Sequence, residues 1–220
     1  MSTVAILPMK PLDQAKQRLS GAITFGHRKA LAEAMFNDVL LATRRASSID
    51  RIFVITSDHT AARIAGGNGA TVIDDTASSH SEAVGLGLAR ALAQNVNRAL
   101  LIPGDCPLLD PREIDALMAR PASTPSALII PDRHGAGTNA LLLTPPDALT
   151  PSFGEGSCRR HWDLAQQAGS LPELVEVPSL ALDIDTPEDF ELLRATLAST
   201  RGGAAHTRGL LSQLERNAVA

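Results

Sequence analysis

Short, uninterrupted apolar runs that alternate with longer amphipathic segments constrain the fold of this chain more than any other feature. The runs are rich in Val, Ile and Leu, which is typical of strands buried on both faces, and they lie at residues 3–8, 51–57, 70–74, 98–103, 126–131, 139–145 and 173–178. The amphipathic segments repeat their apolar residues at helical spacing and lie at residues 25–46, 58–65, 79–94, 111–120, 157–168 and 186–198. Because strands and helices alternate through the first half, we predict an α/β fold with a mixed, mostly parallel sheet and helices on both faces. The second half is less regular, which indicates an antiparallel or mixed edge.

The length of 220 residues suits a single large domain, which we place at residues 1–200. Residues 201–220 start with a Gly/Ala-rich stretch and continue as GLLSQLER. We expect this segment to be a flexible tail, with a short docked helix as the alternative. The helix at 25–46 has an apolar stripe that could pack on the sheet or form the face of a homodimer.

The composition argues against several classes of protein. Aromatic residues make up only 3% of the chain and its net charge is −4, so neither base stacking nor a basic field favours nucleic acid. No apolar stretch approaches the roughly 18 residues of a membrane span. Two cysteines without ligand-like spacing indicate neither a disulfide framework nor a zinc site. We therefore expect a cytoplasmic protein that binds neither nucleic acid nor membranes.

Charged residues gather beside the predicted strand ends, where open parallel sheets bind their ligands. In chain order they are Lys10, Lys16, Arg18, Asp105, Asp183 and Asp185. Three cationic side chains in one loop suit a polyanion such as a triphosphate, and carboxylates suit a hard divalent cation such as Mg²⁺. Gly104 before Asp105 allows the backbone to approach a ligand closely.

Each of these residues also has a purely structural interpretation. Asp105 could stabilise a turn or cap the helix at 111–120, although Asp110 stands directly before that helix. Asp185 precedes Thr-Pro-Glu-Asp, an ordinary helix start, so it could be a cap while Asp183 binds the ion. The cationic residues could form a solvated loop. We favour a metal site with Asp105 and Asp183 as ligands and Asp185 as a further one.

The histidines and cysteines offer no evident catalyst. His80, His134 and His161 lie on different segments, and we interpret them as surface or locally bonded residues. Cys106 has no histidine near it in the sequence, and we interpret it as a small core residue. The chemistry should then depend on charge and positioning rather than on a protein nucleophile.

Five motifs follow one another along the chain: PMKPLDQAKQRLS, GDCPLL, GTNALLL, FGEGS and LDIDTPEDF. Together they resemble the guanylyltransferases of coenzyme F420 biosynthesis, the 2-phospho-L-lactate/phosphoenolpyruvate guanylyltransferase family, from about residue 3 to 195. The resemblance implies one Rossmann-like nucleotidyltransferase domain with a mixed seven-stranded sheet, and GTP and Mg²⁺ as reactants. The chain departs from the family at the start of the third helix, where His80-Ser81-Glu82-Ala83 replaces the frequent Leu-Asn-x-Ala.

The resemblance also implies roles for residues at matching positions. Lys16 and Arg18 would hold the triphosphate, and Asp105, Asp183 and Asp185 would hold Mg²⁺, with Lys16, Arg18 and Asp105 as the catalytic set. The expected substrate-binding residues are Lys10, Thr138, Asn139, Gly154 and Ser157. FGEGS precedes a predicted helix, and a helix N-terminus with a serine hydroxyl is a natural anion site. The alternative is that Ser157 only caps that helix.

The expected function is transfer of GMP from GTP to a three-carbon phospho-acid with release of diphosphate. The acceptor could be phosphoenolpyruvate, 2-phospho-L-lactate or 3-phosphoglycerate. The alternatives are a nucleotidyltransferase for a sugar phosphate or a molybdopterin-type acceptor, and a non-catalytic nucleotide-binding protein on the same fold.

Overall fold

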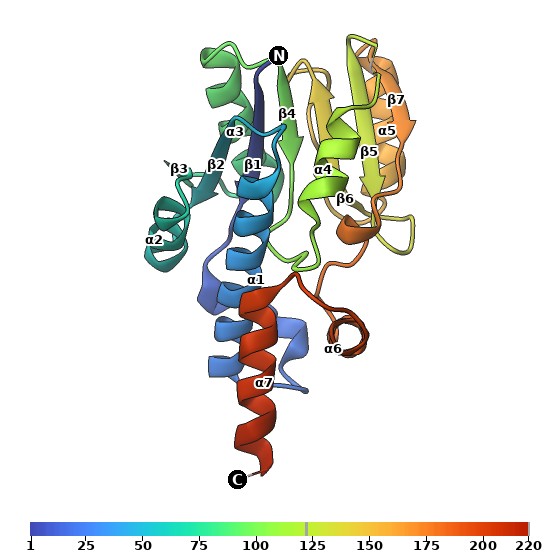
Figure 1. Ribbon diagram of the computed structural model, residues 1–220. Coiled ribbons are helices and arrows are strands. Elements are labelled where there is room, and N and C mark those ends of the chain that lie inside the picture. Colours follow the sequence, from blue (N-terminus) through green and yellow to red (C-terminus); the bar gives the residue numbers. More distant parts are fainter. Residues whose placement is uncertain (122, 220) are drawn as a thin grey trace.

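The computed structural model describes residues 1–121 and 123–219 and contains a seven-stranded sheet in the order β3-β2-β1-β4-β6-β5-β7 (Figure 1). The strands are β1 (Thr3–Pro8), β2 (Arg51–Thr56), β3 (Thr71–Asp74), β4 (Arg98–Leu101), β5 (Ser126–Pro131), β6 (Thr138–Thr144) and β7 (Leu171–Leu174). β6 runs antiparallel to its neighbours β4 and β5, whereas the other pairs are parallel. The predicted α/β class and the mixed, mostly parallel sheet are confirmed.

Two details of the second half differ from the sequence-based expectation. The antiparallel strand is β6, in the interior of the sheet, and the edge strands β3 and β7 both pair in parallel. β6 follows β5 through a short hairpin loop, and such a connection forces antiparallel pairing. β7 ends at Leu174 rather than near residue 178, because Val175 and Val177 turn into the core ahead of the 3₁₀ helix η3 (Pro178–Leu180).

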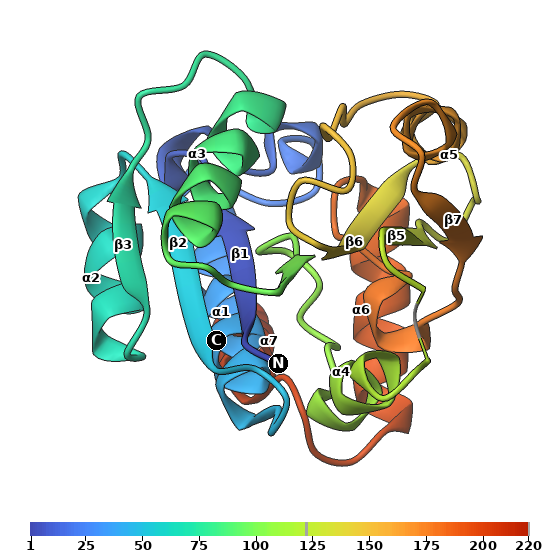
Figure 2. The ribbon, with the colours of Figure 1, turned by 90° about the horizontal axis from the view of Figure 1, so that it is seen from above.

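Helices cover both faces of the sheet. They are α1 (Phe25–Arg45), α2 (His59–Gly67), α3 (His80–Ala93), α4 (Pro111–Met118), α5 (Ser157–Gln167), α6 (Pro187–Ser199) and α7 (Ala205–Val219). α1 and α4 lie on one face and α3 and α5 on the other (Figures 1 and 2). Within β1, Ala5 and Leu7 pack toward α1, and Val4 and Ile6 pack toward α3. Burial on both faces explains why the strands are uninterrupted apolar runs.

Side-chain caps fix where the helices begin. Asp58, Ser79 and Asp110 are the N-caps of α2, α3 and α4. α6 starts with a capping box, in which Thr186 and Asp189 bond each other's backbone N–H groups. The helix starts are therefore satisfied without Asp105 or Asp185, so the capping alternative for those two carboxylates is wrong.

A third apolar cluster joins α6 and α7 to α1. The buried carboxylate of Asp38 on α1 accepts hydrogen bonds from the N–H groups of His206 (2.9 Å) and Thr207 (2.8 Å) at the start of α7. Residues 205–219 thus form a docked helix along α1, where a flexible tail was expected for residues 201–220 (Figure 1). The sheet and α7 also cover the apolar stripe of α1, so this stripe is not free to serve as a homodimer face.

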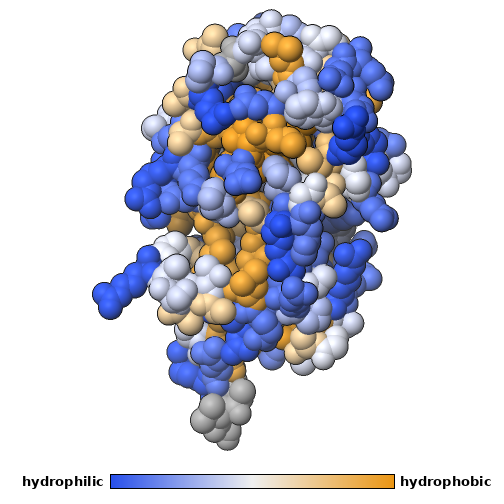
Figure 3. All heavy atoms as spheres, turned by 90° about the vertical axis from the view of Figure 1, so that its right-hand side faces the viewer, coloured by the Kyte–Doolittle hydropathy of each residue, from blue (hydrophilic) through white to orange (hydrophobic). Residues whose placement is uncertain are grey.

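The β7 side of the molecule exposes apolar atoms between polar ones (Figure 3). Leu171 and Leu174 of this edge strand are both more than half exposed. Leu171 donates its N–H group to Pro125, directly before β5, and Val175 donates to Ile129 of β5. Pro172 therefore faces the open edge and offers no N–H for a further strand. Over the part of the chain that the structure describes, no helix is both long and apolar enough to span a bilayer.

Candidate functional site

The candidate site lies along the edge of the sheet where β1 and β4 end. β1 ends at Pro8, and β4 is followed by Ile102-Pro103-Gly104 and then Asp105. β6 runs in the opposite direction, so its first residues, Thr138 and Asn139, lie at this same edge. The segment before α6 brings Asp183 and Asp185 to it, with the Ile184 N–H donating to the Asp105 carbonyl oxygen at 3.3 Å. The topology thus brings together four motifs that are far apart in the sequence.

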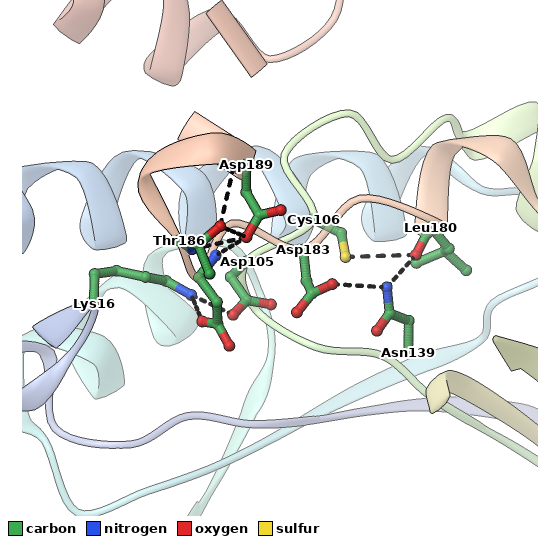
Figure 4. A network of polar contacts seen from close by, with 9 residues as sticks. Lys16, Asp105, Cys106, Asn139, Leu180, Asp183, Thr186 and Asp189 are labelled. Carbon is green, nitrogen blue, oxygen red and sulfur yellow. Dashed lines mark hydrogen bonds and ion pairs between the residues drawn. The ribbon is translucent and has the colours of Figure 1, made fainter. Parts of the chain in front are cut away.

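Lys16 is the centre of the charged part of the site. Its Nζ atom lies 2.5 Å from Asp105 Oδ2 and 2.9 Å from Asp185 Oδ1, and the lysine side chain is only 7% exposed (Figure 4). Burial lowers the pKa of Lys16, but the charges of both carboxylates and their hydrogen bonds outweigh it and raise the pKa above the ordinary value. Lys16 is therefore a fixed cation, and it is not a proton donor near neutral pH.

The backbone of Lys16 is held in an unusual conformation. It has φ 58° and ψ 36°, the left-handed region that residues other than glycine adopt rarely, and it directly precedes the 3₁₀ helix η2 (Gln17–Leu19). Such a conformation persists where surrounding contacts hold it in place. Here the two ion pairs hold it, because they fix the end of the Lys16 side chain.

Asp183 and Asn139 form the second polar contact of the site. Asn139 Nδ2 donates to the Leu180 carbonyl oxygen at 2.8 Å and to Asp183 Oδ1 at 3.2 Å (Figure 4). Burial, together with the nearby charges of Asp105 and Asp185, raises the pKa of Asp183. Three carboxylates gathered this closely favour the binding of positive charge.

A divalent cation fits the carboxylates of this site, but only if substrate phosphates complete its coordination. Within residues 1–121 and 123–219, no group of three His, Cys, Asp or Glu side chains is arranged to hold a metal by itself. Lys16 already lies between Asp105 and Asp185, while the buried Oδ1 atom of Asp105 has no hydrogen-bond partner in the described structure. Mg²⁺ is usually held by one or two carboxylates together with substrate phosphates. The free oxygen of Asp105 and the carboxylate of Asp183 suit that arrangement.

A side chain in place of the glycine before Asp105 would require its neighbours to move. A Cβ atom at Gly104 would lie 2.7 Å from Met9 Sδ and 3.3 Å from Phe36 Cδ2. The loop after β4 therefore packs directly against the loop after β1, which keeps Asp105 within reach of Lys16. Cys106 is fully buried, and burial raises the pKa of its thiol well above its usual value, which confirms its interpretation as a core residue.

Two cavities meet at these carboxylates. The first, of about 310 Å³, is lined by Lys10, Lys16, Asp105 and Asp185 among others. The second, of about 780 Å³, has in its walls Arg18, Thr138, Asn139, Gly154, Ser157 and Asp183, together with Asp185. A smaller cavity of about 140 Å³ lies between them and shares Asp105, Thr138 and Asp183. Every expected site residue thus lines one of the cavities, with Lys10 and Arg18 exposed at their margins.

The loop at 151–157 forms one wall of the larger cavity. Gly154 (φ +114°) and Gly156 (φ +67°) adopt backbone conformations that favour glycine, and Gly156 occupies the N-cap position of α5. Ser157 is therefore not a cap. Its Oγ atom accepts a hydrogen bond from the Thr138 N–H at 2.9 Å, which ties the start of α5 to the start of β6.

His161 is locally bonded, one of the two alternatives expected from the sequence, but its contact with Thr138 was not predicted. It is fully buried, with Nε2 accepting from the Ser152 N–H and Nδ1 lying 2.9 Å from Thr138 Oγ1. The available signal was its spacing: His161 follows Ser157 by four residues, so both lie on one face of α5. His80, at the start of α3, also lines all three cavities and packs edge-on against Phe153.

Comparison with known proteins identifies relatives along almost the whole chain. The family described as "Guanylyl transferase CofC like" matches residues 3–215. A phosphoenolpyruvate guanylyltransferase of Conexibacter woesei is 51% identical over 218 residues, covering 98% of each chain. A 3-phospho-D-glycerate guanylyltransferase of Colwellia psychrerythraea is 35% identical over 193 residues, covering 88% of this chain and 91% of its own length.

Solved structures agree with the fold. A putative nucleotide-diphospho-sugar transferase from Desulfovibrio desulfuricans superposes with a TM-score of 0.74 at 15% identity, covering 98% of this chain and 96% of its own. A CMP:2-keto-3-deoxy-manno-octonic acid synthetase complexed with CTP gives a TM-score of 0.61 at 14% identity, covering 90% and 99%. At these identities the likeness concerns the nucleotidyltransferase fold. The match over residues 3–215 and the close relative show that the chain belongs to the CofC-like guanylyl transferase family.

Proposed function

We propose that this protein is a guanylyltransferase that transfers GMP from GTP to phosphoenolpyruvate and releases diphosphate. The observation that carries the proposal is the Lys16 amine held between Asp105 and Asp185, at the junction of two polar cavities. One cavity would hold the triphosphate beside Lys10 and Lys16, and the other would hold the acceptor beside Thr138.

The relatives support the choice of acceptor. The relative from C. woesei, at 51% identity, is named for phosphoenolpyruvate, as are relatives from Sphaerobacter thermophilus and Rubrobacter xylanophilus at 36% each. Others, from C. psychrerythraea and Phenylobacterium zucineum, are named for 3-phospho-D-glycerate at 35% and 37% identity. Because these acids differ by a few atoms, 3-phosphoglycerate is the second candidate.

The reaction needs positioning and charge neutralisation rather than a general base. An oxygen of the acceptor's phosphate is already anionic, and it would attack the α-phosphorus of GTP. A new P–O bond would form to GMP while the bond from the α-phosphorus to the β-phosphate oxygen breaks, and diphosphate would leave with the electron pair. Lys16, fixed as a cation beside the cavity assigned to the triphosphate, would offset the charge that develops on the leaving group, and Arg18 would add positive charge from the margin of the adjoining larger cavity.

We propose Mg²⁺ as the cofactor, held by Asp105 and Asp183 together with phosphate oxygens, and with Asp185 as a further ligand. When bound, Mg²⁺ would supply Lewis-acid neutralisation of the phosphate charge. Asp185 also pairs with Lys16, the cation that would neutralise the charge on the leaving diphosphate. Both roles require the carboxylates to be ionised.

The proposed substrates also suggest the cellular setting. GTP and phosphoenolpyruvate are metabolites of the cytoplasm, and the family resemblance points to coenzyme F420 biosynthesis. We propose that the protein acts there, with small molecules as its partners.

The test is diphosphate release with GTP and Mg²⁺ and each acceptor in turn: phosphoenolpyruvate, 2-phospho-L-lactate and 3-phosphoglycerate. ATP and CTP serve as nucleotide controls. We expect release with GTP and phosphoenolpyruvate above the other pairs. Preference for CTP, or nucleotide binding without diphosphate release for any acceptor, would contradict the proposal.

A further inference from the structure

We propose that His161 is a positioning residue that turns the hydroxyl hydrogen of Thr138 toward the acceptor anion in the larger cavity. The proposal rests on the proposed function and deepens it, since it assigns the directed hydrogen bond that the acceptor's phosphate or carboxylate would receive. The positioning role of His161 is independent of the proposed phosphoryl chemistry and of the ion pairs at Lys16.

The geometry begins with two residues of α5 that hold one residue of β6. Ser157 and His161 lie on the same helix face, and both are buried. Ser157 Oγ accepts from the Thr138 N–H at 2.9 Å, and His161 Nδ1 lies 2.9 Å from Thr138 Oγ1. The backbone and the side chain of Thr138 are thus fixed from the same helix.

The backbone of Ser152 determines the direction of the second bond. Its N–H points at His161 Nε2 at 2.9 Å, and an N–H can only donate, so Nε2 carries no hydrogen. The ring proton of the neutral imidazole then lies on Nδ1, which donates to Thr138 Oγ1. The threonine oxygen is the acceptor in this pair, so its own hydrogen is free to point elsewhere.

The hydroxyl hydrogen of Thr138 can point into a cavity. In the described structure, Thr138 Oγ1 has no side-chain hydrogen bond other than that with His161. Thr138 lines both the larger cavity and the smaller cavity that adjoins Asp105. A hydroxyl donor aimed into this space suits an anionic oxygen, which cannot donate in return.

The surroundings keep His161 neutral and immobile. Burial and the nearby charge of Arg160 lower the pKa of His161 to about 4, so the ring is uncharged near neutral pH. Phe153 packs edge-on against the ring, with centroids 4.9 Å apart, and His80 packs on Phe153 at 5.0 Å. A rigid donor loses little entropy when the acceptor binds.

Two substitutions separate the two ring nitrogens. His161→Asn places an amide near the Nδ1 position and can still donate to Thr138, whereas His161→Gln reaches the Nε2 position and cannot. We expect His161→Gln to raise the KM for the acceptor by up to about tenfold, because loss of the whole hydrogen bond to a charged group is the upper limit when the Thr138 hydroxyl is no longer oriented, with the KM for GTP unchanged within about twofold. His161→Asn should raise the acceptor KM less, and the opposite order would overturn the proposal.

A double-mutant cycle distinguishes positioning from general destabilisation. If His161 acts only through the Thr138 hydroxyl, His161→Gln should change the acceptor KM little in a Thr138→Val background. Equal additional losses in both backgrounds, or equal increases in the KM for GTP and acceptor, would contradict it. Ser170→Ala is the matched control, because it removes a buried hydroxyl that bonds the Ala148 carbonyl oxygen outside these cavities.

One measurement needs no catalytic activity and separates this proposal from the proposed function. Long-range ¹⁵N–¹H NMR of the histidine rings reports which nitrogen carries the proton in the wild-type protein. We expect His161 to have a protonated Nδ1 and a bare Nε2 at pH 7. The reverse tautomer would make Thr138 the donor to His161 and would overturn the inference, whatever the protein is found to catalyse.

Discussion

Replacing Lys16 with methionine should destabilise the protein through the carboxylates that it leaves behind. The substitution keeps the length of the side chain and removes the amine between Asp105 and Asp185. Removing one partner of a buried ion pair lowers the free energy of unfolding by about 3–5 kcal/mol. The side chain of Asp105 is 26% exposed and that of Asp185 47% exposed, so solvent screening reduces the expected loss to about 2 kcal/mol.

The assay is thermal unfolding with and without Mg²⁺. For a domain of this size, a loss of about 2 kcal/mol corresponds to a fall in Tm of about 4–8 °C. The matched control is Lys10→Met, which removes an exposed lysine of the same loop and should change the free energy of unfolding by less than about 0.5 kcal/mol. Because the variant leaves Asp105 and Asp185 without their lysine, Mg²⁺ should raise its Tm more than that of the wild type. An unchanged Tm in Lys16→Met, or no difference from the control, would refute the reasoning.

Three other perturbations test the remaining parts of the account. Asp105→Asn should reduce turnover by at least about 100-fold with an unchanged circular dichroism spectrum, because it removes one of the two carboxylates that pair with Lys16. Near wild-type turnover would exclude Asp105 from the chemistry. Asp38→Ala should cost about 1–2 kcal/mol by removing the two bonds at the start of α7, and limited proteolysis should then cut residues 201–219 faster than in the wild type. The unfolded chain protonates His161 near pH 6.5 and the folded protein only near pH 4, so this residue should lower the free energy of unfolding by about 2 kcal/mol between pH 7.5 and 5. Urea unfolding should show a smaller pH dependence in His161→Gln; the same slope in both proteins would contradict the shifted pKa.

The fold was largely predictable because its strands are buried on both faces. Runs such as TVAILP and RIFVIT leave no polar face, and only a covered, mostly parallel sheet accommodates them. The position of β6 was not predictable, since a hairpin fixes the direction of a strand but not the neighbour on its other side. The docking of α7 also escaped prediction, because it depends on Asp38, a carboxylate 168 residues away from the N–H that it accepts.

The candidate site was also predictable only in part. The position of Asp105 after β4 and of Lys16 after β1 followed from the rule that ligands bind at strand ends. Their direct ion pair did not follow, because it depends on the left-handed turn at Lys16 and on the close packing at Gly104. His161 is locally bonded, as one of the two alternatives had it, but its bond to Thr138 was not predicted, because its partners Ser152 and Thr138 belong to other segments.

The fate of labelled phosphate tests the central claim most directly. The protein is incubated with Mg²⁺, phosphoenolpyruvate and GTP labelled with ³²P either at the α- or at the γ-phosphate. We predict that the α-label appears in a guanosyl product that contains the three-carbon acid, and that the γ-label appears in diphosphate. A γ-label in free orthophosphate or on the acceptor would show GTP hydrolysis or kinase chemistry instead, and would contradict nucleotidyl transfer at this site.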